Sequence, residues 1–301
     1  MTRRSGAWAA LCLLGFSTPA FAEEPASALQ SIVPQAGFFA GLGGSYNSVK
    51  IDQDIGGTAT SDIYAGSILV ASGEAGGPSV DFDDSDEAWA PDAQAGYFSR
   101  FKGGPWLWGA KFSYKYLEAD VTSGPDNIPQ SGSFTTSAAP VLGLPPITTD
   151  FTGDVVIRSS QTTVKQQLAL MPFIGRAFHN SYVYFGAGPA LFDTQSRVNS
   201  AIGFADIDGE TLNVTGAAES FSSSEWVWRG AAQIGMNYLL GPPWFVDVNY
   251  TFAMSASFDE DYVAPFSNTS SAGLTTEGVA HLDTSQRVTS QAVTVSINKV
   301  F

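Results

Sequence analysis

The sequence is poor in cysteine, in charged residues and in long apolar runs. Its single cysteine, Cys12, lies near the amino terminus, so the rest of the chain has neither a disulfide nor a thiolate metal site. Charged residues make up 14% of the 301 residues, whereas an ordinary soluble domain has about 25%. Past the amino terminus no apolar run approaches the roughly 20 residues that a transmembrane helix needs. There are 14 basic residues against 29 acidic ones, which argues against a nucleic-acid partner.

Aromatic residues and glycine are, in contrast, abundant. Phe, Trp and Tyr together reach 13%, and there are 31 glycines. A disordered chain would have more charge and fewer aromatic residues. The composition therefore predicts a β-rich protein in which apolar residues alternate with small polar ones.

The amino-terminal segment has the three parts of a secretory signal peptide. Arg3 and Arg4 form a short basic region, residues 7–16 are apolar, and Ala20-Phe21-Ala22 matches the small-x-small cleavage pattern. We therefore expect residues 1–22 to be removed during export through the periplasm. Residues 23–36 are then expected to form a periplasmic tail, followed by one barrel domain over residues 37–301.

Eight later segments alternate apolar and small or polar residues with a period of two, which is typical of strands with one apolar face. They cover 37–49, 89–101, 106–119, 163–178, 182–195, 226–240, 244–257 and 288–301. A soluble sandwich also alternates, but its exposed face carries Lys, Glu and Thr. The second face of these segments is instead rich in Gly, Ala, Ser and Asn, which favours the crowded lumen of a narrow membrane barrel.

Aromatic residues gather at the ends of these segments, as in the two interfacial girdles of a membrane barrel. One group consists of Phe38, Phe101, Trp106, Trp108, Phe178, Trp244 and Phe301, and the other of Tyr46, Trp89, Tyr116 and Trp226. The step from Trp89 to Phe101 covers about 30 Å of height at about 3.3 Å per residue and a tilt of about 40°. That height is close to the spacing of two girdles.

Short and long connections alternate strictly along the chain. The short ones cover 102–105, 179–181 and 241–243, and the long ones about 50–88, 120–162, 196–225 and 258–287. The pattern predicts an all-β fold: a closed antiparallel up-and-down transmembrane β-barrel of eight strands, with four long external loops and three short periplasmic turns. Segments 63–72 and 155–159 are candidates for an extra hairpin, which leaves a ten-stranded barrel as an alternative.

Three segments resemble small opacity-type and outer-membrane-protein-A-like barrels of Gram-negative bacteria. Residues 37–46 look like their opening strand, and residues 182–190 resemble their fifth strand. The carboxyl terminus is similar to the signal read by the barrel-assembly machinery, with Val293, Val295, Ile297 and Phe301 in place and Lys299 where an aromatic residue is common. The resemblance implies location in the cell outer membrane. It covers the strands and not the loops, which carry the function in this superfamily.

Seven charged residues have the parity of the polar face and are expected in the lumen. They are Asp92, Arg100, Lys111, Lys115, Lys165, Arg229 and Asp247. If Phe101 and Trp106 pair across the turn between them, Asp92 lies opposite Lys115, and we expect these two to form an ion pair. Bulky inward residues such as Phe39, Phe98, Phe173 and Tyr184 predict a lumen filled by side chains.

Four cations follow the outward parity at the external ends of the strands: Lys50, Arg158, Arg197 and Arg287. We expect them to form a belt at the height of lipopolysaccharide phosphates, where fixed cations make charge-assisted hydrogen bonds. Outer-membrane lipids and lipopolysaccharide are therefore the expected partners. The competing interpretation is that parity is lost beyond the bilayer and these residues scatter through the loops.

The sequence contains no convincing catalytic, cofactor or metal site. His179 lies in a predicted turn, and His281, near Asp283 and Ser285, lacks the local Ser-His arrangement of lipid A deacylases. The acidic runs at 81–87 and 206–210 lack the full ligand spacing of calcium loops, although weak divalent binding stays open.

We therefore expect a non-enzymatic barrel with a filled lumen. Its long acidic loops would serve envelope integrity, adhesion or contact with a host or surface ligand. A narrow porin-like passive pore is the alternative, and a lipid-modifying enzyme is a remote one.

Overall fold

The fold is known from a computed structural model, which describes residues 32–102, 104–136, 145–207, 209–255 and 257–301. Contacts divide the chain into residues 1–30 and residues 31–301, and all the strands belong to the second unit. The predicted signal peptide lies outside the described residues. Within them, no helix is long and apolar enough to cross a membrane.

The described residues form twelve strands. They are β1 (Ala36–Ala65), β2 (Ile68–Gly76), β3 (Val80–Arg100), β4 (Trp106–Ser123), β5 (Asp126–Thr136), β6 (Thr148–Ala177), β7 (Ser181–Ile207), β8 (Glu210–Asn213), β9 (Glu219–Gly241), β10 (Trp244–Ser255), β11 (Phe258–Thr269) and β12 (Leu274–Val300). Every pairing between them is antiparallel.

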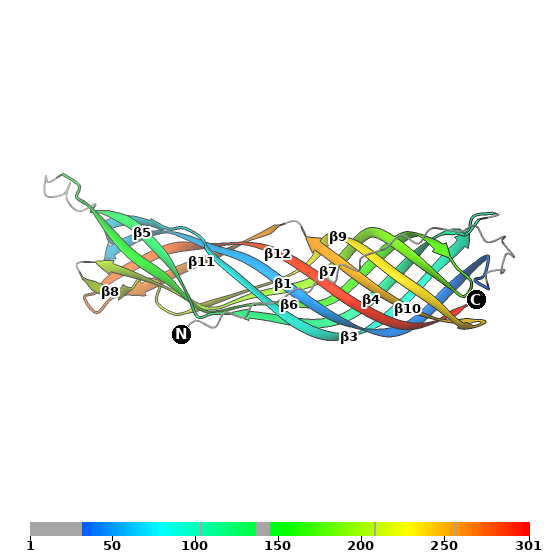
Figure 1. Ribbon diagram of the computed structural model, residues 1–301. Helices are drawn as coiled ribbons and strands as arrows, with labels where there is room; N and C mark the ends of the chain where they lie inside the picture. Colours follow the sequence, from blue (N-terminus) through cyan, green and yellow to red (C-terminus); the bar gives the residue numbers. More distant parts are fainter. Residues whose placement is uncertain (1–31, 103, 137–144, 208, 256) are drawn as a thin grey trace, which may run out of the picture. The chain divides into compact units, whose positions relative to one another are not determined.

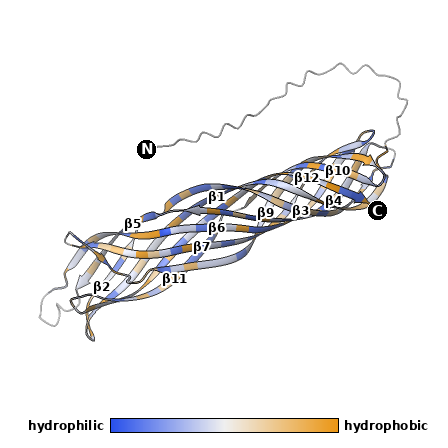
Figure 2. Cartoon of the chain, turned by 90° about the horizontal axis from the view of Figure 1, so that it is seen from below, coloured by the Kyte–Doolittle hydropathy of each residue, from blue (hydrophilic) through white to orange (hydrophobic). Residues whose placement is uncertain are grey.

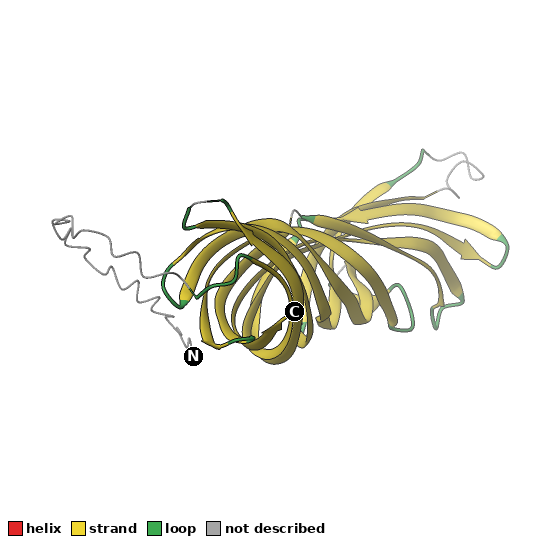
Figure 3. Ribbon diagram, turned by 90° about the vertical axis from the view of Figure 1, so that its right-hand side faces the viewer, coloured by secondary structure: helices red, strands yellow, loops and turns green. Residues whose placement is uncertain are grey.

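Eight of these strands close into a ring, in the order β1, β3, β4, β6, β7, β9, β10 and β12. The ring closes because β12 pairs back with β1, with Tyr46 opposite Val293 and Phe39 opposite Val300. Short turns join β3 to β4, β6 to β7 and β9 to β10 at one end of the ring, which Figure 3 shows nearly end on. The prediction of an eight-stranded up-and-down barrel is confirmed.

The strands run well beyond the predicted barrel segments. β1 and β6 each have 30 residues, and β7 and β12 each have 27. The segments expected to be long loops are therefore largely β-structure. We call this part, residues 50–87, 120–136, 145–163, 196–207, 209–225 and 257–287, the external extension; Figures 1 and 2 show it continuing from the ring towards β2, β5 and β8. Period-two alternation did not reveal it, because its inward positions mix large apolar residues such as Ile55 and Ile157 with small or polar ones such as Gly57 and Gln53.

The candidate hairpin at 63–72 exists, but it does not enlarge the ring. β1 turns into β2 through Gly66, whose φ of +62° lies in the left-handed region that glycine adopts without strain. β2 pairs with the end of β1 and with β5, and residues 155–159 are part of β6. Both candidates lie in the external extension, so the ten-stranded alternative is wrong for the ring.

Large apolar side chains are exposed in a belt around the ring. The belt includes Phe38, Leu42, Trp89, Trp108, Phe112, Leu170, Ile174, Phe185, Trp228, Ile234, Leu240, Val248, Met254 and Ile297. The predicted girdle residues other than Tyr46 belong to it, and Tyr46 is half-buried with its ring 5.1 Å from that of Trp89 between centroids. An apolar outer face of this extent suits lipid and would be costly in water.

Glycines on the inner face give space to aromatic rings from neighbouring strands. A Cβ on Gly96 would lie 2.5 Å from Cζ of Phe39, and one on Gly235 would lie 2.5 Å from Cζ of Tyr184. Neither contact is possible unless the aromatic side chain of Phe39 or Tyr184 is displaced. The small residues of the inner face are therefore what allows a narrow barrel to be filled by large ones.

Candidate functional site

An aromatic cluster closes the ring lumen at the end with the short turns, which is the predicted periplasmic end. It consists of Val33, Phe39, Phe98, Leu107, Phe173, Ala177, Tyr182, Tyr184, Leu239 and Phe245. The ring centroids of Phe98 and Tyr182 lie 5.7 Å apart, and those of Phe39 and Phe245 lie 5.5 Å apart. Val33 comes from the segment before β1. The described end of the predicted periplasmic tail therefore packs against the lumen.

A buried polar network lies next to the aromatic cluster. Lys111 Nζ lies 2.9 Å from Asp247 Oδ2, and these side chains are only 3% and 2% exposed. Tyr184 donates a hydrogen bond to Asp247 Oδ1 at 2.8 Å and accepts one from Lys111 at 2.7 Å. Gln94 and Asn249 also donate to Asp247. The network joins residues of β3, β4, β7 and β10 across the lumen. Removal of one charge of the ion pair would leave the other charge buried and unpaired, which is costly.

The predicted ion pair between Asp92 and Lys115 is not formed, although the predicted register of β3 and β4 is confirmed. Asp92 does lie opposite Lys115 on β3 and β4. Lys115 Nζ instead donates to Thr294 Oγ1 at 3.0 Å, and Asp92 Oδ1 has no hydrogen-bond partner. In a narrow barrel a long lysine reaches across the lumen more readily than sideways to its direct neighbour. The buried ion pair that the structure has there, between Lys111 and Asp247, joins non-adjacent strands.

The other predicted lumen charges lie in three different settings. Arg229 is buried, with its guanidinium 4.2 Å from the ring centroid of Phe192, and its Nη1 donates to a backbone carbonyl on β12 at 2.7 Å. Arg100 is half-buried at the short-turn end, where it donates to backbone carbonyls. Lys165 lies at a bulge in β6 and is half-exposed. The bulge shifts the parity of β6, so Lys165 does not belong to the buried lumen set.

A second apolar cluster fills the lumen on the other side of the polar network. Its members are Val49, Ile51, Ala90, Leu117, Ala119, Val121, Val164, Ala169, Met171, Ala190, Phe192, Ala231, Ala253 and Val288. Val49, Phe192 and Val288 are completely buried. The ring lumen thus consists of an aromatic layer, a polar layer and an aliphatic layer, each made of interlocked side chains.

The four predicted belt cations are all exposed, and they form two pairs. Lys50 and Arg287 lie on the neighbouring strands β1 and β12, and Arg158 and Arg197 lie on the neighbouring strands β6 and β7. Lys50 Nζ contacts Asp52 at 2.5 Å and Asp83 at 3.5 Å. The two pairs therefore lie at separate positions around the outside of the barrel, one on β1 and β12 and the other on β6 and β7. Lys50 already has carboxylate neighbours.

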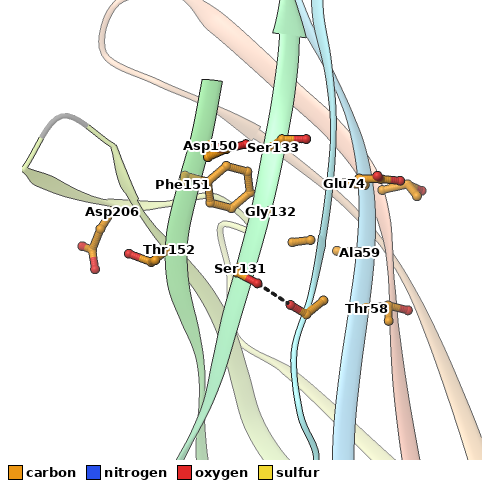
Figure 4. Close-up of a pocket in the computed structure, with 13 residues that line it drawn as sticks. Thr58, Ala59, Glu74, Ser131, Gly132, Ser133, Asp150, Phe151, Thr152 and Asp206 are labelled. Carbon is orange, nitrogen blue, oxygen red and sulfur yellow. Dashed lines mark hydrogen bonds between the residues drawn. The ribbon is translucent and has the colours of Figure 1, made fainter. Parts of the chain in front are cut away.

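The external extension has an outer groove of about 820 Å³ (Figure 4), lined by hydroxyl and carboxyl side chains and also by Ala59, Ala75 and Phe151. Two rungs of paired residues cross β1, β2, β5 and β6 here: Thr60, Glu74, Ser133 and Asp150 in one, and Thr58, Gly76, Ser131 and Thr152 in the other. Asp206 on β7 continues the second rung. The groove thus presents hydroxyl groups and carboxylates to the outside.

Acidic residues also pair across strands in the extension. Asp54 lies opposite Asp81, and a hydrogen bond between the two carboxyl groups raises the pKa of Asp54. Partial burial, followed by a hydrogen bond with Asp261, raises the pKa of Asp283. Among the described residues, no group of three or more His, Cys, Asp or Glu is arranged to hold a metal ion. His179 and His281 are both exposed, on a turn and on β12.

Sequence reasoning missed both the outer groove and an apolar cavity of about 350 Å³ inside the extension. The cavity is lined by residues of the segments that were predicted to be loops. A weak signal was present, because Gly57, Ala59, Gly73 and Ala75 alternate with polar residues in the same way as the ring strands. Without apolar residues of any size, that alternation does not distinguish a strand from a glycine-rich loop.

No family model and no curated protein matches this chain. Among solved structures, it is similar to the outer membrane protein OprG from Pseudomonas aeruginosa, with 14% identity, coverage of 89% of this chain and 97% of that one, and a TM-score of 0.35. It is also similar to Neisserial surface protein A (10% identity, 85% and 97% coverage, TM-score 0.28). A third similar structure is that of Ail, the attachment invasion locus protein of Yersinia pestis (12% identity, coverage of 81% of this chain and 98% of that one, TM-score 0.23).

The architecture is that of a small outer-membrane β-barrel. This rests on the geometry of the chain itself, because the TM-scores are all below 0.5. The ring is closed, antiparallel and even-numbered, with an apolar outer belt, aromatic girdles and short turns at one end only. The outer membrane is the location that this architecture implies.

Proposed function

We propose that the chain is a closed, non-enzymatic outer-membrane barrel that holds a rigid acidic β-tube outside the cell. The observation that carries the proposal is the filling of the ring lumen by an aromatic, a polar and an aliphatic layer. An eight-stranded ring leaves room for side chains and little more. The barrel then acts as an anchor, and the external extension carries the function.

The extension suits contact with ligands that donate hydrogen bonds or carry positive charge. Most of the 29 acidic residues lie in it, against the four basic residues Lys50, Arg158, Arg197 and Arg287. The outer groove adds hydroxyl groups to these carboxylates. We infer that amines or polyhydroxylated surface molecules are the chemistry it would recognise, in adhesion or in contacts within the envelope.

The residues of the proposed assembly signal have the expected outward orientation. Val293, Val295, Ile297 and Phe301 are each about half or more exposed. We propose that the barrel-assembly machinery reads these apolar side chains before the ring closes, when β12 is not yet paired with β1.

A conductance measurement in planar bilayers tests the closed lumen. We expect the wild-type protein to give no resolvable channel steps. A variant with Phe39, Phe98 and Tyr182 all changed to Ala thins the aromatic layer but leaves the polar and aliphatic layers in place, so it is also expected to give no steps. Resolvable steps from the wild-type protein that are absent from bilayers without it would overturn the proposal.

A narrow passive pore is the second candidate, and one observation favours it. Several buried polar atoms of the lumen have no protein partner, among them Asp92 Oδ1, Gln167 Oε1 and Asn237 Oδ1. Such atoms are usually satisfied by water. Osmotic swelling of proteoliposomes by small solutes, absent from liposomes without the protein, would support this candidate over the closed barrel.

A further inference from the structure

The apolar cavity inside the external extension is lined by residues of β1, β2, β5, β6, β7, β8, β11 and β12. Side chains that line it include Ile63 on β1, Phe134 on β5, Phe151 on β6, Leu212 on β8, Phe266 on β11 and Leu274 on β12. The rings of Phe134 and Phe151 lie 6.4 Å apart between centroids. Residues far apart in the sequence thus converge on one space in the tube.

The cavity exists because the inward residues at this height are small. Ala59 lies opposite Ala75, and Ser61 lies opposite Gly73, on the neighbouring strands β1 and β2. Ala205 on β7 also lines the space. In the ring the corresponding inward positions hold Phe, Tyr and Met, which fill the lumen. A third apolar cluster of Ile55, Ile128, Ile157, Val198 and Leu282 fills the extension next to the ring, and the cavity lies further out along β1, from Ala59 to Ile63.

The size and chemistry of the cavity fit an aromatic molecule better than water. A buried water needs two to four polar partners, whereas a dry apolar cavity of about 150 Å³ suffices to bind benzene. At about 350 Å³, this cavity has room for a molecule of about two aromatic rings, and it falls within the range of ligand pockets. We propose that it binds a small, neutral, apolar molecule taken up from outside the cell.

The position of the cavity makes a membrane lipid an unsuitable occupant. From the girdle residue Tyr46 to Ala59 is a step of 13 residues along β1, or about 33 Å of height at about 3.3 Å per residue and a tilt of about 40°. Acyl chains in the bilayer therefore do not reach it. Among the residues that line the cavity the charged one is Glu74, which disfavours an anion.

The wall beside the cavity has a seam between β8 and β11, where the described residues of the two strands are not paired with each other. β8 pairs with β7, and β11 pairs with β12, but the pairings of the described residues include none between β8 and β11. The two are linked there by a hydrogen bond from Asn268 Nδ2 to the carbonyl of Asn213 at 2.7 Å. Leu212 and Phe266 lie on the two sides of this seam and also line the cavity.

The test is a binding titration of the full mature protein in lipid nanodiscs with N-phenyl-1-naphthylamine, a neutral aromatic probe that fluoresces in apolar surroundings. We expect saturable binding of one probe per protein above the signal of empty nanodiscs. The variant Ala59→Phe/Ala205→Phe fills the cavity and is expected to weaken binding at least about tenfold. Val263→Phe adds an aromatic ring to the exposed face of β11, outside both the groove and the cavity lining, and is expected to leave binding unchanged.

Two outcomes overturn the proposal: a wild-type signal equal to that of empty nanodiscs, or equal affinity in the wild-type and filled variants. If the double variant loses the heat-modifiable migration of a folded barrel, the milder Ala205→Leu takes its place with the same expectation. The anionic probe 8-anilinonaphthalene-1-sulfonate is expected to bind more weakly than the neutral probe, and equal affinity would overturn the preference for neutral ligands. None of these results depends on whether the ring lumen conducts ions.

Discussion

At the scale of the residue, the lumen depends on charges that are buried and shared. Asp247 accepts hydrogen bonds from Lys111, Tyr184, Gln94 and Asn249, so its charge is held by donors from three other strands. Taking a carboxylate and an ammonium group out of water is expensive, and their attraction offsets this only when both are present and well oriented. We therefore expect the Lys111–Asp247 pair to favour one arrangement of the closed ring over others more than it adds to the net free energy of unfolding.

Removal of one member of this pair is predicted to destabilise the barrel strongly. Lys111→Met leaves Asp247 buried without its cation, which is expected to cost about 3–5 kcal/mol of the free energy of unfolding. Urea titrations followed by heat-modifiable gel migration measure the loss. Lys102→Met, in the exposed β3–β4 turn, is the control and should have little effect. Lys111→Met/Asp247→Asn removes both charges but keeps an acceptor for Tyr184 and Gln94, so it should recover much of the loss, and a double variant as unstable as the single one would contradict this account.

A pH dependence is predicted for the acidic pairs of the extension. The pKa values of Asp54 and Asp283 are raised in the folded chain. The folded state therefore binds protons more tightly than the unfolded state, and the extension gains stability as the pH falls through these raised pKa values. We expect limited proteolysis of the extension to be slower near about pH 4 than at about pH 7.

The matched variants separate this effect from a general effect of acid. Asp54→Asn/Asp283→Asn is expected to resist protease at about pH 7 as well as the wild type does near about pH 4. Asp150→Asn, whose opposite residue is Ser133, should retain the pH dependence of the wild type. Faster cleavage of the wild-type extension in acid would show that the sign is wrong.

At the scale of the element, the long strands exchange partners where the ring ends. β3 pairs with β4 from Asp92 to Arg100 and not beyond, and further out β2 and β5 pair with each other instead. Their ladder joins residues 71–76 to residues 131–136. This exchange extends the ring into a wall of paired strands, which among the described residues is interrupted between β8 and β11.

Gly77 is predicted to be essential to that exchange. It follows β2 directly, and a Cβ at this position would lie 1.9 Å from the carbonyl oxygen of Pro129 on β5. Because the obstacle is backbone, Gly77→Ala is expected to displace β5 at a cost of about 1–3 kcal/mol. Protease cleavage of the extension should accelerate while the ring keeps its heat-modifiable migration.

Gly56→Ala is the control for this prediction, since its nearest neighbour would be Cβ of Ser79 at an ordinary 3.7 Å. Equal cleavage rates for the two variants would show that the close approach at Gly77 tolerates a methyl group.

At the scale of the whole unit from residue 31 to residue 301, an apolar ring continues into a polar tube. The ring exposes large apolar side chains, and the extension exposes carboxylates and hydroxyl groups. The exposed cations Lys50, Arg158, Arg197 and Arg287 lie beyond the aromatic girdle that includes Tyr46 and Trp89. They occupy two separate positions around the outside of the barrel. Such positions suit the phosphates of lipopolysaccharide, which is why we propose them as contacts to that layer.

The two cation pairs are predicted to contribute unequally. Lys50 already contacts Asp52 and Asp83, so Arg158→Gln/Arg197→Gln should lower thermal stability in lipopolysaccharide more than Lys50→Gln/Arg287→Gln does. The expected loss is about 0.2–1 kcal/mol for each cation removed. Neither double variant should change stability in a zwitterionic detergent. Losses of the same size in both media would rule out a contact with lipopolysaccharide.

The sequence by itself determined the ring. Period-two alternation, the small residues of the inner face and the alternation of short and long connections are local properties, and they were enough to predict eight strands, their inward and outward faces and the register that sets Asp92 opposite Lys115. Only the tertiary structure decided that Lys111 pairs with Asp247, that β2 pairs with β5, and that the extension encloses a cavity. These contacts join residues distant in sequence, and they depend on how far a side chain reaches across a closed lumen and on which edges meet when the ring closes. No local periodicity carries that information.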